Sequence, residues 1–344
     1  MNYVGMDIHK RTIRAEVKDS TGRTIQRQTI RARRESLREW ASGVPGPFMA
    51  TFEATLFTGW VYDEMIRHAE KVRVANPQLL HYISKTKKKS DKLDAGKLAD
   101  LLRVDMIPEC YMLPEDARML RELLRYRHWL IRECTRFKNK ITGQLMTHGV
   151  EYDGSRIHRK RYFREFARTL EADKRLVEML QFSRGQLEVL SELERRVMRL
   201  LYTDPGLSAR VELLTSIPGV GEITALTWAL EVWDPHRFSN SKKAISFCGL
   251  CSAQRESAGH EVRGPLSKQR NKRLQWVLVE ASKIAVHRLG VPELVAVYER
   301  TAAQKNKNAA TIAVARELVK WLLAVDKRGT PFTESNGKGS GSTV

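Results

Sequence analysis

The chain has 344 residues, a length that favours two or three domains over one compact core. It carries 60 Lys and Arg against 40 Asp and Glu, a formal net charge of +20 that is typical of proteins that bind a polyanion such as nucleic acid. No apolar run reaches the roughly 18 residues that a membrane-spanning helix needs, and the amino terminus has the pattern of a strand rather than a signal peptide. We therefore expect a cytoplasmic protein with no membrane partner.

The first apolar run, "YVGMDIHKRT" at residues 3–12, contains a single acidic residue. Asp7 lies between Met6 and Ile8, in a stretch that predicts a central strand. An unpaired carboxylate inside such a strand costs on the order of a few kcal/mol. Asp7 therefore needs a cationic partner.

The first hundred residues alternate strand and helix signals. We expect strands at 3–8, 13–19, 24–30, 48–54 and 71–75, and helices at 34–41, at 60–69 and from "DKLDAGKLADLL" to residue 108. The first three strands form an antiparallel meander, and the later ones follow helices and are parallel. This order is the pattern of an α/β RNase H-like (RuvC-like) domain, which we place at residues 1–110.

Four acidic residues lie where such a sheet would bring them together. Asp7 is on the first strand, Glu53 ends the fourth, and Asp91 and Asp94 are one turn apart on the closing helix. Converging carboxylates repel one another unless cations separate them. Two divalent ions, Mg²⁺ or Mn²⁺, about 4 Å apart and held by these oxygens, would remove the repulsion and support phosphoryl transfer.

Each of these carboxylates except Asp7 also has an ordinary structural reading. Glu53 follows Thr51 on what is then a partly polar strand end, and Asp91 fits a helix cap after Ser90. Asp94 fits a solvated partner of Lys97 or Lys87. The case for a metal site depends on the four residues together.

Residues 111–204 have the character of long helices. Apolar residues recur at 4-3 spacing from Leu176 to Leu201, which predicts a helical hairpin or coiled coil. Basic and aromatic residues alternate in "RIHRKRYFR", which fits either a solvated helix face or a surface that follows phosphates.

A mostly helical region follows at 205–328, and the Gly- and Ser-rich tail at 329–344 is expected to be disordered. The opening of the helical region, "LTSIPGVGEITAL", predicts two helices joined at residues 218–221 as a helix-hairpin-helix. In that motif Gly219 and Gly221 let backbone N–H groups approach a phosphate, whereas the simpler alternative is a tight helix-helix turn.

The motifs "GMDIHK", "FEAT", "KSDKLDAGKLADLL", "FCGL" and "RLQWVLVEAS" occur in this order over about residues 1–325. This set resembles the DEDD recombinases of bacterial insertion sequences, the Piv-type transposase and invertase family, whose members are guided by a bridge RNA. The resemblance implies that Asp7, Glu53, Asp91 and Asp94 are the metal-binding tetrad. It also implies a coiled-coil dimerisation segment, a carboxyl-terminal transposase domain, and a tetramer, built as a dimer of dimers, on donor and target duplexes.

The family places its nucleophilic serine eight residues after the glycine of "FCGL", which is Ser257 in this chain. The chain departs from the family pattern in having Ser252, Ala258 and Arg270 where proline, glycine and glycine are usual, so Ser252 is a rival nucleophile. The following basic segment fits a phosphate contact or a solvated face. Its four cations are Lys268, Arg270, Lys272 and Arg273.

The resemblance predicts a site-specific DNA recombinase that cuts and rejoins strands through a serine–phosphate intermediate. One alternative is a junction-resolving nuclease that only hydrolyses, which needs the four carboxylates but no serine. Another is a basic nucleic-acid scaffold without catalysis. These three functions differ in whether DNA is cut and rejoined, only cut, or left intact.

Overall fold

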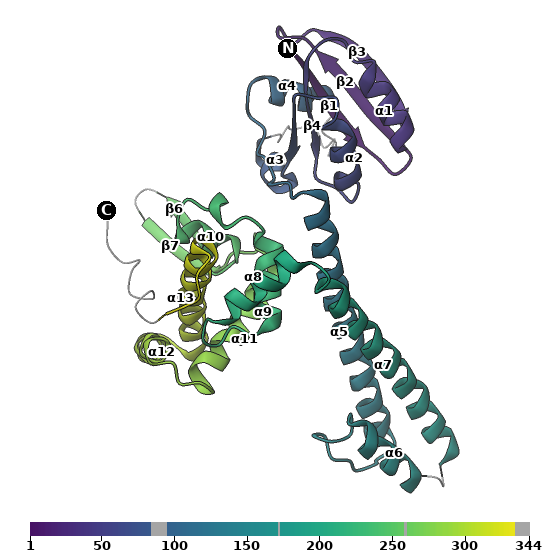
Figure 1. The fold of residues 1–344 in the computed structure, drawn as a ribbon, viewed down its shortest axis with the longest axis vertical. Helices are drawn as coiled ribbons and strands as arrows, with labels where there is room; N and C mark the ends of the chain where they lie inside the picture. The colour runs from purple at the N-terminus through teal and green to yellow at the C-terminus, as the bar shows by residue number, and fades with distance from the viewer. Residues whose placement is uncertain (84–94, 171–172, 258–259, 334–344) are drawn as a thin grey trace. The chain divides into compact units, whose positions relative to one another are not determined.

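The computed structural model describes the backbone of residues 1–83, 95–170, 173–257 and 260–333, and their side chains except at 82, 253–257 and 260–263. The chain forms two compact units, Met1–Arg118 and Met119–Val344 (Figure 1). The predicted regions 111–204 and 205–328 thus lie largely in the second unit, and their separation into two domains stays a prediction.

Five strands form a mixed sheet in the first unit. They are β1 (Asn2–Ile8), β2 (Thr12–Lys18), β3 (Thr24–Arg31), β4 (Phe48–Glu53) and β5 (Lys71–Ala75), in the spatial order β3-β2-β1-β4-β5. β1, β2 and β3 are antiparallel neighbours, whereas β4 is parallel to both β1 and β5. The predicted antiparallel start and parallel remainder are confirmed, and the sheet is consistent with an RNase H-like domain.

Different helices cover the two faces of this sheet. The helices of this unit are α1 (Arg34–Ser42), α2 (Thr58–Met65), α3 (Pro77–Ile83) and α4 (Ala95–Arg103). Val4, Met6 and Ile8 of β1 pack in one core with α1 and α2. Because alternate residues of a strand point to opposite faces, Tyr3 lies on the other side, in a cluster with α3 and α4. β1 is therefore covered on both faces, which explains its nearly continuous apolar sequence.

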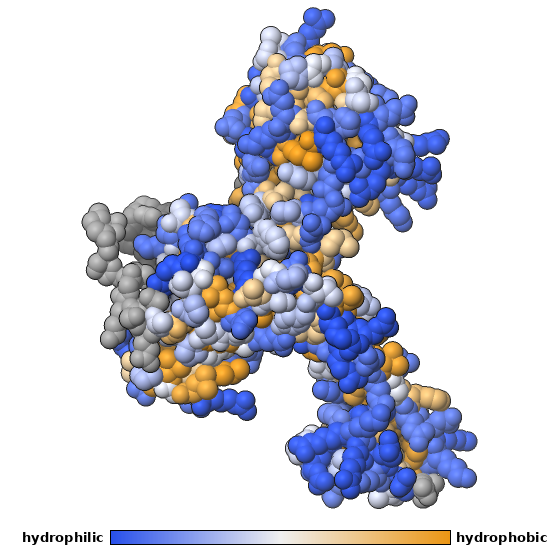
Figure 2. Space-filling model, in the orientation of Figure 1, coloured by the Kyte–Doolittle hydropathy of each residue, from blue (hydrophilic) through white to orange (hydrophobic). Residues whose placement is uncertain are grey.

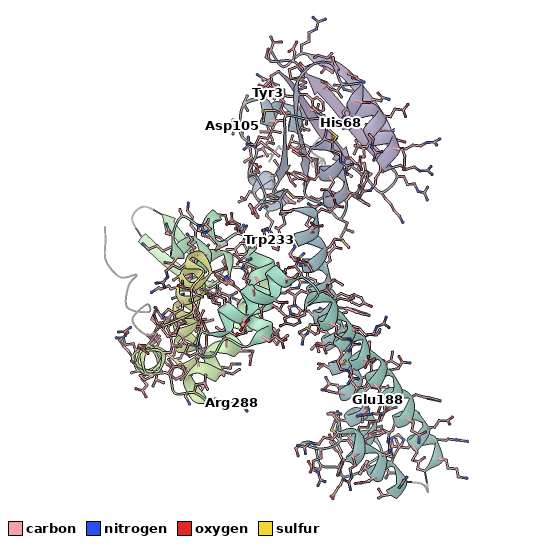
Figure 3. All side chains as sticks on the ribbon, in the orientation of Figure 1. Tyr3, His68, Asp105, Glu188, Trp233 and Arg288 are labelled. Carbon is pink, nitrogen blue, oxygen red and sulfur yellow. The ribbon has the colours of Figure 1, made fainter. Side chains whose placement is uncertain are left out.

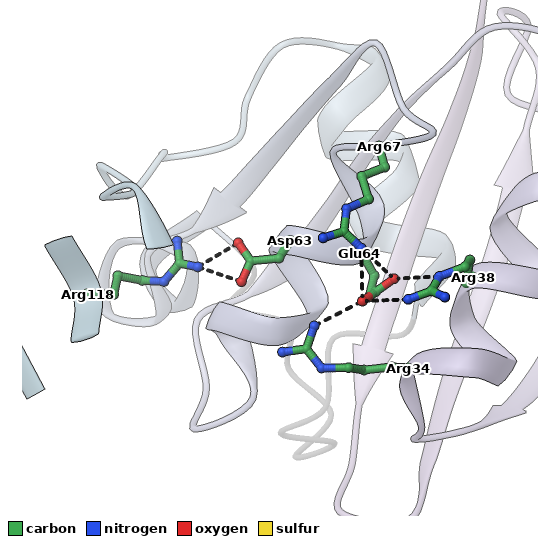
Figure 4. Close-up of polar contacts among 6 residues, drawn as sticks. All are labelled: Arg34, Arg38, Asp63, Glu64, Arg67 and Arg118. Atoms are coloured by element: carbon green, nitrogen blue, oxygen red, sulfur yellow. Dashed lines mark hydrogen bonds and ion pairs between the residues drawn. The ribbon is translucent and has the colours of Figure 1, made fainter. Parts of the chain in front are cut away.

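A buried carboxylate links α1 to α2. Glu64 on α2 is 1% exposed, and Arg34 and Arg38 of α1 donate to it at 2.9 and 3.1 Å (Figure 4). Arg67 adds a third donor at 3.3 Å. The hydrogen bond from Arg38 is the largest cause that lowers the pKa of Glu64, and burial opposes it. An ionised Glu64 therefore holds the two helices together.

The short helix α3 was not expected. It begins at Asn76-Pro77, directly after the strand expected at 71–75. The side-chain oxygen of Asn76 accepts the backbone N–H of Gln78 at 3.0 Å, and Pro77 occupies the first helical position. Asn followed by Pro is a helix-start signal as well as a strand stop.

Long helices form a hairpin in the second unit. They are α5 (Glu115–Thr147) and α7 (Lys174–Leu201), with α6 (Lys160–Thr169) between them in sequence. Leu176, Leu180 and Leu187 of the predicted 4-3 run are buried in a core that they share with Ile141 and Leu145 of α5. The predicted pair of long helices is present.

The segment "RIHRKRYFR" packs onto this hairpin through its apolar residues. Ile157 and Phe163 are buried in the hairpin core, while the surface over α6 is largely hydrophilic (Figure 2). Glu188 of α7, labelled in Figure 3, accepts from Arg184 at 3.0 Å and pairs with Lys160 at 3.2 Å. This ion pair ties α6 to α7.

The remainder of the second unit is mostly helical and contains one strand pair. Its elements are α8 (Pro205–Thr215), α9 (Glu222–Val232), η1 (Pro235–Arg237), α10 (Ser241–Phe247), β6 (Ser252–Ser257), β7 (His260–Leu266), α11 (Lys272–His287), α12 (Pro292–Gln304) and α13 (Lys307–Arg328). Trp228 is fully buried at the centre and donates to Asp326 at 2.8 Å. The β6–β7 hairpin was not predicted. Among the described helices, none combines the length and apolar character required to cross a membrane.

Candidate active site

Asp7 and Glu53 lie side by side at the carboxyl ends of two neighbouring parallel strands. β1 and β4 pair with Met6 opposite Phe52, so the next residue on each strand, Asp7 and Glu53, is also adjacent. Met6 and Phe52 pack in the core with α1 and α2. Asp7 and Glu53 therefore belong to the opposite face, on which α4 packs.

The electrostatics of this pair are those of two carboxylates that repel each other. Burial raises the pKa of Glu53, and the charge of Asp7 raises it further. Asp7 has a local partner, because its Oδ2 lies 2.9 Å from His9 Nε2. Within the described residues, Glu53 receives no hydrogen bond or ion pair. A cation bound by both carboxylates would remove the cause of this repulsion.

The start of α4 is held directly against β1. A Cβ atom added to Gly5 would lie 1.9 Å from the carbonyl oxygen of Ala95 and 2.5 Å from the backbone nitrogen of Ala99. Glycine is therefore required at this position for the helix to approach the strand. Ala95 directly follows Asp94, but the predicted ligands Asp91 and Asp94 themselves lie outside the described residues.

Glu16 on β2 is a buried carboxylate that the sequence analysis did not select. It is 2% exposed, pairs in register with Gly5, and lies beneath Gly96 of α4. Its two oxygens accept from Arg27, each at 2.9 Å, and this hydrogen bonding is the largest cause that lowers its pKa. Glu16 is thus neutralised by the protein, in contrast to Glu53. Its position between two apolar residues of β2 was the available signal.

The donor chemistry of this edge of the sheet suits a hard divalent cation. Carboxylate oxygens are the preferred protein ligands of Mg²⁺, and Asp7 and Glu53 supply them from two rigid strands. In the described part of the chain, which excludes Asp91 and Asp94, no three His, Cys, Asp or Glu side chains come together as a metal site. The four-carboxylate site stays a prediction. Two of its members, Asp7 and Glu53, are adjacent in the structure.

Ser257 is the last residue of β6. Its backbone pairs with His260 of β7, and its side chain and the following residue lie outside the described atoms. The rival Ser252 begins the same strand, opposite Leu266. The two serines therefore occupy opposite ends of one strand.

The glycine of "FCGL" and the basic segment are in contact. Gly249 has a φ of +74°, and a Cβ atom there would lie 2.2 Å from Cβ of Arg270. Gln275 donates to the Gly249 carbonyl at 2.6 Å. Arg270 is half-buried by this packing, whereas the other cations of the segment are exposed. Those exposed cations are Lys268, Lys272 and Arg273.

The turn between α8 and α9 contains the two glycines of the predicted helix-hairpin-helix. Gly219 has a φ of +88° and faces α11, where an added Cβ would lie 2.6 Å from Cβ of Ala285. Gly221 is the N-cap of α9, and nothing lies within 4 Å of its Cβ position. Gly219 is thus needed for close helix packing, while a side chain at Gly221 would meet no neighbour.

Two family patterns match this chain. Residues 4–149 match the DEDD transposase of IS110, and residues 211–299 match the transposase IS116/IS110/IS902 family. The two matches are in the order that the motifs predicted, and they include Asp7 and Glu53 in the first and Ser257 in the second. The chain belongs to the DEDD-type insertion-sequence transposases. Membership in this family implies a DNA transposase or recombinase that binds DNA.

Several named relatives agree with this assignment. The transposase is 23% identical to the transposase for insertion sequence element IS1328 of Yersinia enterocolitica, over 97% of this chain and 99% of the relative. It is 24% identical to the pilin gene-inverting protein of Moraxella lacunata, over 74% of this chain and 73% of that protein. A relative from Sinorhizobium fredii is 26% identical over 65% of this chain, and the match spans only 55% of that protein.

Proposed function

We propose that this transposase is a bridge-RNA-guided, site-specific DNA recombinase that cuts and rejoins strands through a metal-assisted serine–phosphate intermediate. The observation that supports the catalytic part most directly is the adjacency of Asp7 and Glu53 at the ends of β1 and β4, with the pKa of Glu53 raised. A structural carboxylate pair would be satisfied by cationic side chains, as Glu16 and Glu64 are. Glu53 lacks such a partner among the described residues.

In the proposed reaction Asp7, Glu53, Asp91 and Asp94 would hold two divalent ions, Mg²⁺ or Mn²⁺. These ions would supply charge stabilisation at the scissile phosphate. His9 fixes the orientation of the Asp7 carboxylate through its 2.9 Å contact. The raised pKa of Glu53 means that metal binding has to displace a proton more often there than at an ordinary glutamate.

The hydroxyl of Ser257 is the proposed nucleophile. Its Oγ forms a bond to phosphorus while the bond to one DNA oxygen breaks, and the released DNA hydroxyl takes up a proton. The serine ester conserves the phosphate bond, so the hydroxyl of another strand can reverse the step and rejoin the DNA. Ser252 would take the same part if it is the residue in reach of the phosphate.

The remaining parts of the proposal concern nucleic acid and assembly. Gly221 at the open N-terminus of α9 and the exposed Lys268, Lys272 and Arg273 are proposed phosphate contacts. Gly219 and Arg270 would act by shaping these segments, because both are packed against neighbours. The α5–α7 hairpin is the proposed coiled-coil dimerisation element of a dimer of dimers.

A reconstitution experiment tests this function as a whole. The protein is purified, the RNA that accompanies it is sequenced, and two DNA duplexes with segments complementary to that RNA are supplied with Mg²⁺. The proposal predicts recombinant DNA that joins the two duplexes, and a mismatched RNA should abolish it. Cut but unjoined products would favour the hydrolytic nuclease, and intact DNA would favour the scaffold.

A further inference from the structure

One face of α5 carries aromatic and basic side chains next to the start of α11. Arg125, His128, Trp129 and Arg132 follow the spacing i, i+3, i+4, i+7, which places them on a common helix face. The ring of His128 meets the ring of Trp276 on α11 edge-on, with centroids 6.3 Å apart. Residues nearly 150 positions apart in sequence thus form one surface within the second unit.

The large aromatic rings of this surface are unusually exposed. Trp129 is 46% exposed, Trp276 is 55% exposed, and Tyr126, whose ring lies 5.3 Å from that of Trp129, is 48% exposed. Aromatic rings bury large areas when they have the chance, so a group of exposed ones marks a binding surface more often than a bare exterior.

Three arginines, Arg125, Arg132 and Arg273, give this surface a positive charge. The buried carboxylate of Glu231 lies beneath it, but Arg125 already binds it with two hydrogen bonds of 2.9 and 2.8 Å, and Asn271 adds a third at 2.8 Å. Arg132 and Arg273 are exposed, and among the described residues neither has a hydrogen bond or close ion pair. Partial burial is the largest cause that lowers the pKa of Arg273, and the charges of Arg125 and Arg132 lower it further.

His128 adds a hydrogen-bonding atom without a partner. Its Nε2 is buried and makes no hydrogen bond within the described part of the chain. Burial and the charges of Arg127 and Arg273 lower the pKa of His128 to about 4, so the ring is neutral at physiological pH. This neutral ring packs edge-on against Trp276 and supports the exposed indole from within the protein.

We propose that the face formed by Trp129, Trp276, Arg132 and Arg273 binds unpaired nucleotides of single-stranded nucleic acid. Bases stack on the two tryptophans and the backbone phosphates lie at the arginines. Duplex DNA does not suit this surface, because its base faces are already stacked. This inference rests on the proposed function in assuming that the transposase has a nucleic-acid partner, and it assigns the unpaired segments of that partner to this face.

A second copy of the chain fits the same face less well. In a two-fold symmetric contact each patch would meet itself, which would bring Arg132 and Arg273 against the same cations of the other copy. A polyanion with exposed flat bases complements both the charge and the rings.

The test compares binding of a labelled, unstructured single-stranded RNA with binding of a duplex DNA at one salt concentration, by fluorescence anisotropy. The variant with both Trp129→Ala and Trp276→Ala should lose single-strand affinity by roughly tenfold or more per ring, and keep duplex affinity within about twofold. Trp129→Phe with Trp276→Phe should retain most single-strand affinity, because a smaller ring still stacks. Leu200→Ala with Leu289→Ala is the matched control, since these side chains are 51% and 57% exposed.

Crosslinking gives an independent measure of the same contact. RNA that contains 5-bromouridine, irradiated on the wild-type protein, should yield crosslinked peptides that contain Trp129 or Trp276. The proposal would be overturned if the double alanine variant bound single-stranded RNA as tightly as the wild type. A change in the oligomeric mass of that variant with no change in its RNA affinity would overturn it as well. A wild-type protein that binds neither RNA nor DNA would overturn the proposed function as well.

Discussion

At the scale of single residues, two buried carboxylates, Glu16 and Glu64, contrast with the half-buried Glu53. Glu16 and Glu64 each accept hydrogen bonds from arginine, and these bonds lower their pKa values. Glu53 has a raised pKa from burial and from Asp7. Perturbed pKa values cluster at functional sites, so the raised pKa of Glu53 beside Asp7 favours a functional role for this pair.

Asp7→Asn tests the role of this pair in two ways. It should reduce DNA cleavage by more than about 100-fold, because a metal-binding charge is lost without a change of shape. It should also lower the pKa of Glu53, which can be followed by NMR of the labelled carboxyl carbon, since one cause of the raised value is removed.

The same variant should be more stable than the wild type when metal is absent. A carboxyl group whose folded pKa is raised binds its proton more tightly in the folded state, so stability falls as pH rises through that range. Removing the charge of Asp7 reduces this loss at neutral pH. Thermal unfolding in the presence of a chelator should therefore show a higher midpoint for Asp7→Asn, and added Mg²⁺ should stabilise the wild type alone.

The pH dependence of stability that we expect from Glu64 has the opposite sign. Its folded pKa is lowered, so its contribution to stability is present above the ordinary carboxyl pKa and is lost as pH falls through the folded value. Glu64→Gln should cost about 2 kcal/mol at neutral pH, because three half-exposed arginines lose a buried partner. Urea unfolding should show a difference in unfolding free energy between the wild type and Glu64→Gln that is smaller at acidic pH than at neutral pH. Glu39→Gln, at an exposed position of α1, is the matched control.

At the scale of elements, the helices and strands whose formation depends on a local pattern of apolar residues could be predicted from the sequence. The alternation of apolar residues predicted the strands around Asp7 and Glu53, and the 4-3 spacing predicted α7. The β6–β7 hairpin escaped prediction because its strands are polar. Glu16 was missed because its arginine partner comes from the neighbouring strand, and such a pairing depends on register. The adjacency of Asp7 and Glu53 could be predicted only through the sheet order.

The approach of α4 to β1 is a feature that sequence alone could not reveal, and Gly5 provides its test. Gly5→Ala places a Cβ atom 1.9 Å from the Ala95 carbonyl oxygen, so α4 has to move away from the strand. We expect a loss of about 3 kcal/mol in the free energy of unfolding. Loss of cleavage activity should accompany it, because α4 directly follows Asp94.

Gly185→Ala is the control for the glycine test. Gly185 lies on α7 with nothing within 4 Å of its Cβ position, so alanine should stabilise that helix by up to about 1 kcal/mol. Equal stabilities for Gly5→Ala and the wild type would show that α4 is not held against β1 as described.

At the scale of the whole molecule, the excess of cations governs binding. With 60 Lys and Arg against 40 Asp and Glu, nucleic-acid affinity should fall steeply with salt, by about 0.9 in log K per log salt for each phosphate neutralised on duplex DNA. A protein purified at low salt should carry nucleic acid that ribonuclease removes. Bound nucleic acid that yields only to deoxyribonuclease would contradict the guide-RNA part of the proposal.

The recombinase differs from a nuclease in one chemical species, the covalent protein–DNA intermediate. The most direct measurement is therefore to stop the reaction of the wild-type protein with DNA, guide RNA and Mg²⁺, denature it, and map any DNA-bearing peptide by mass. We predict an adduct on the peptide that contains Ser257, absent from both Asp7→Asn and Ser257→Ala; an adduct on Ser252 would move the nucleophile within β6 and keep the mechanism. Strand exchange at the wild-type rate by a variant that lacks both serines would contradict the account.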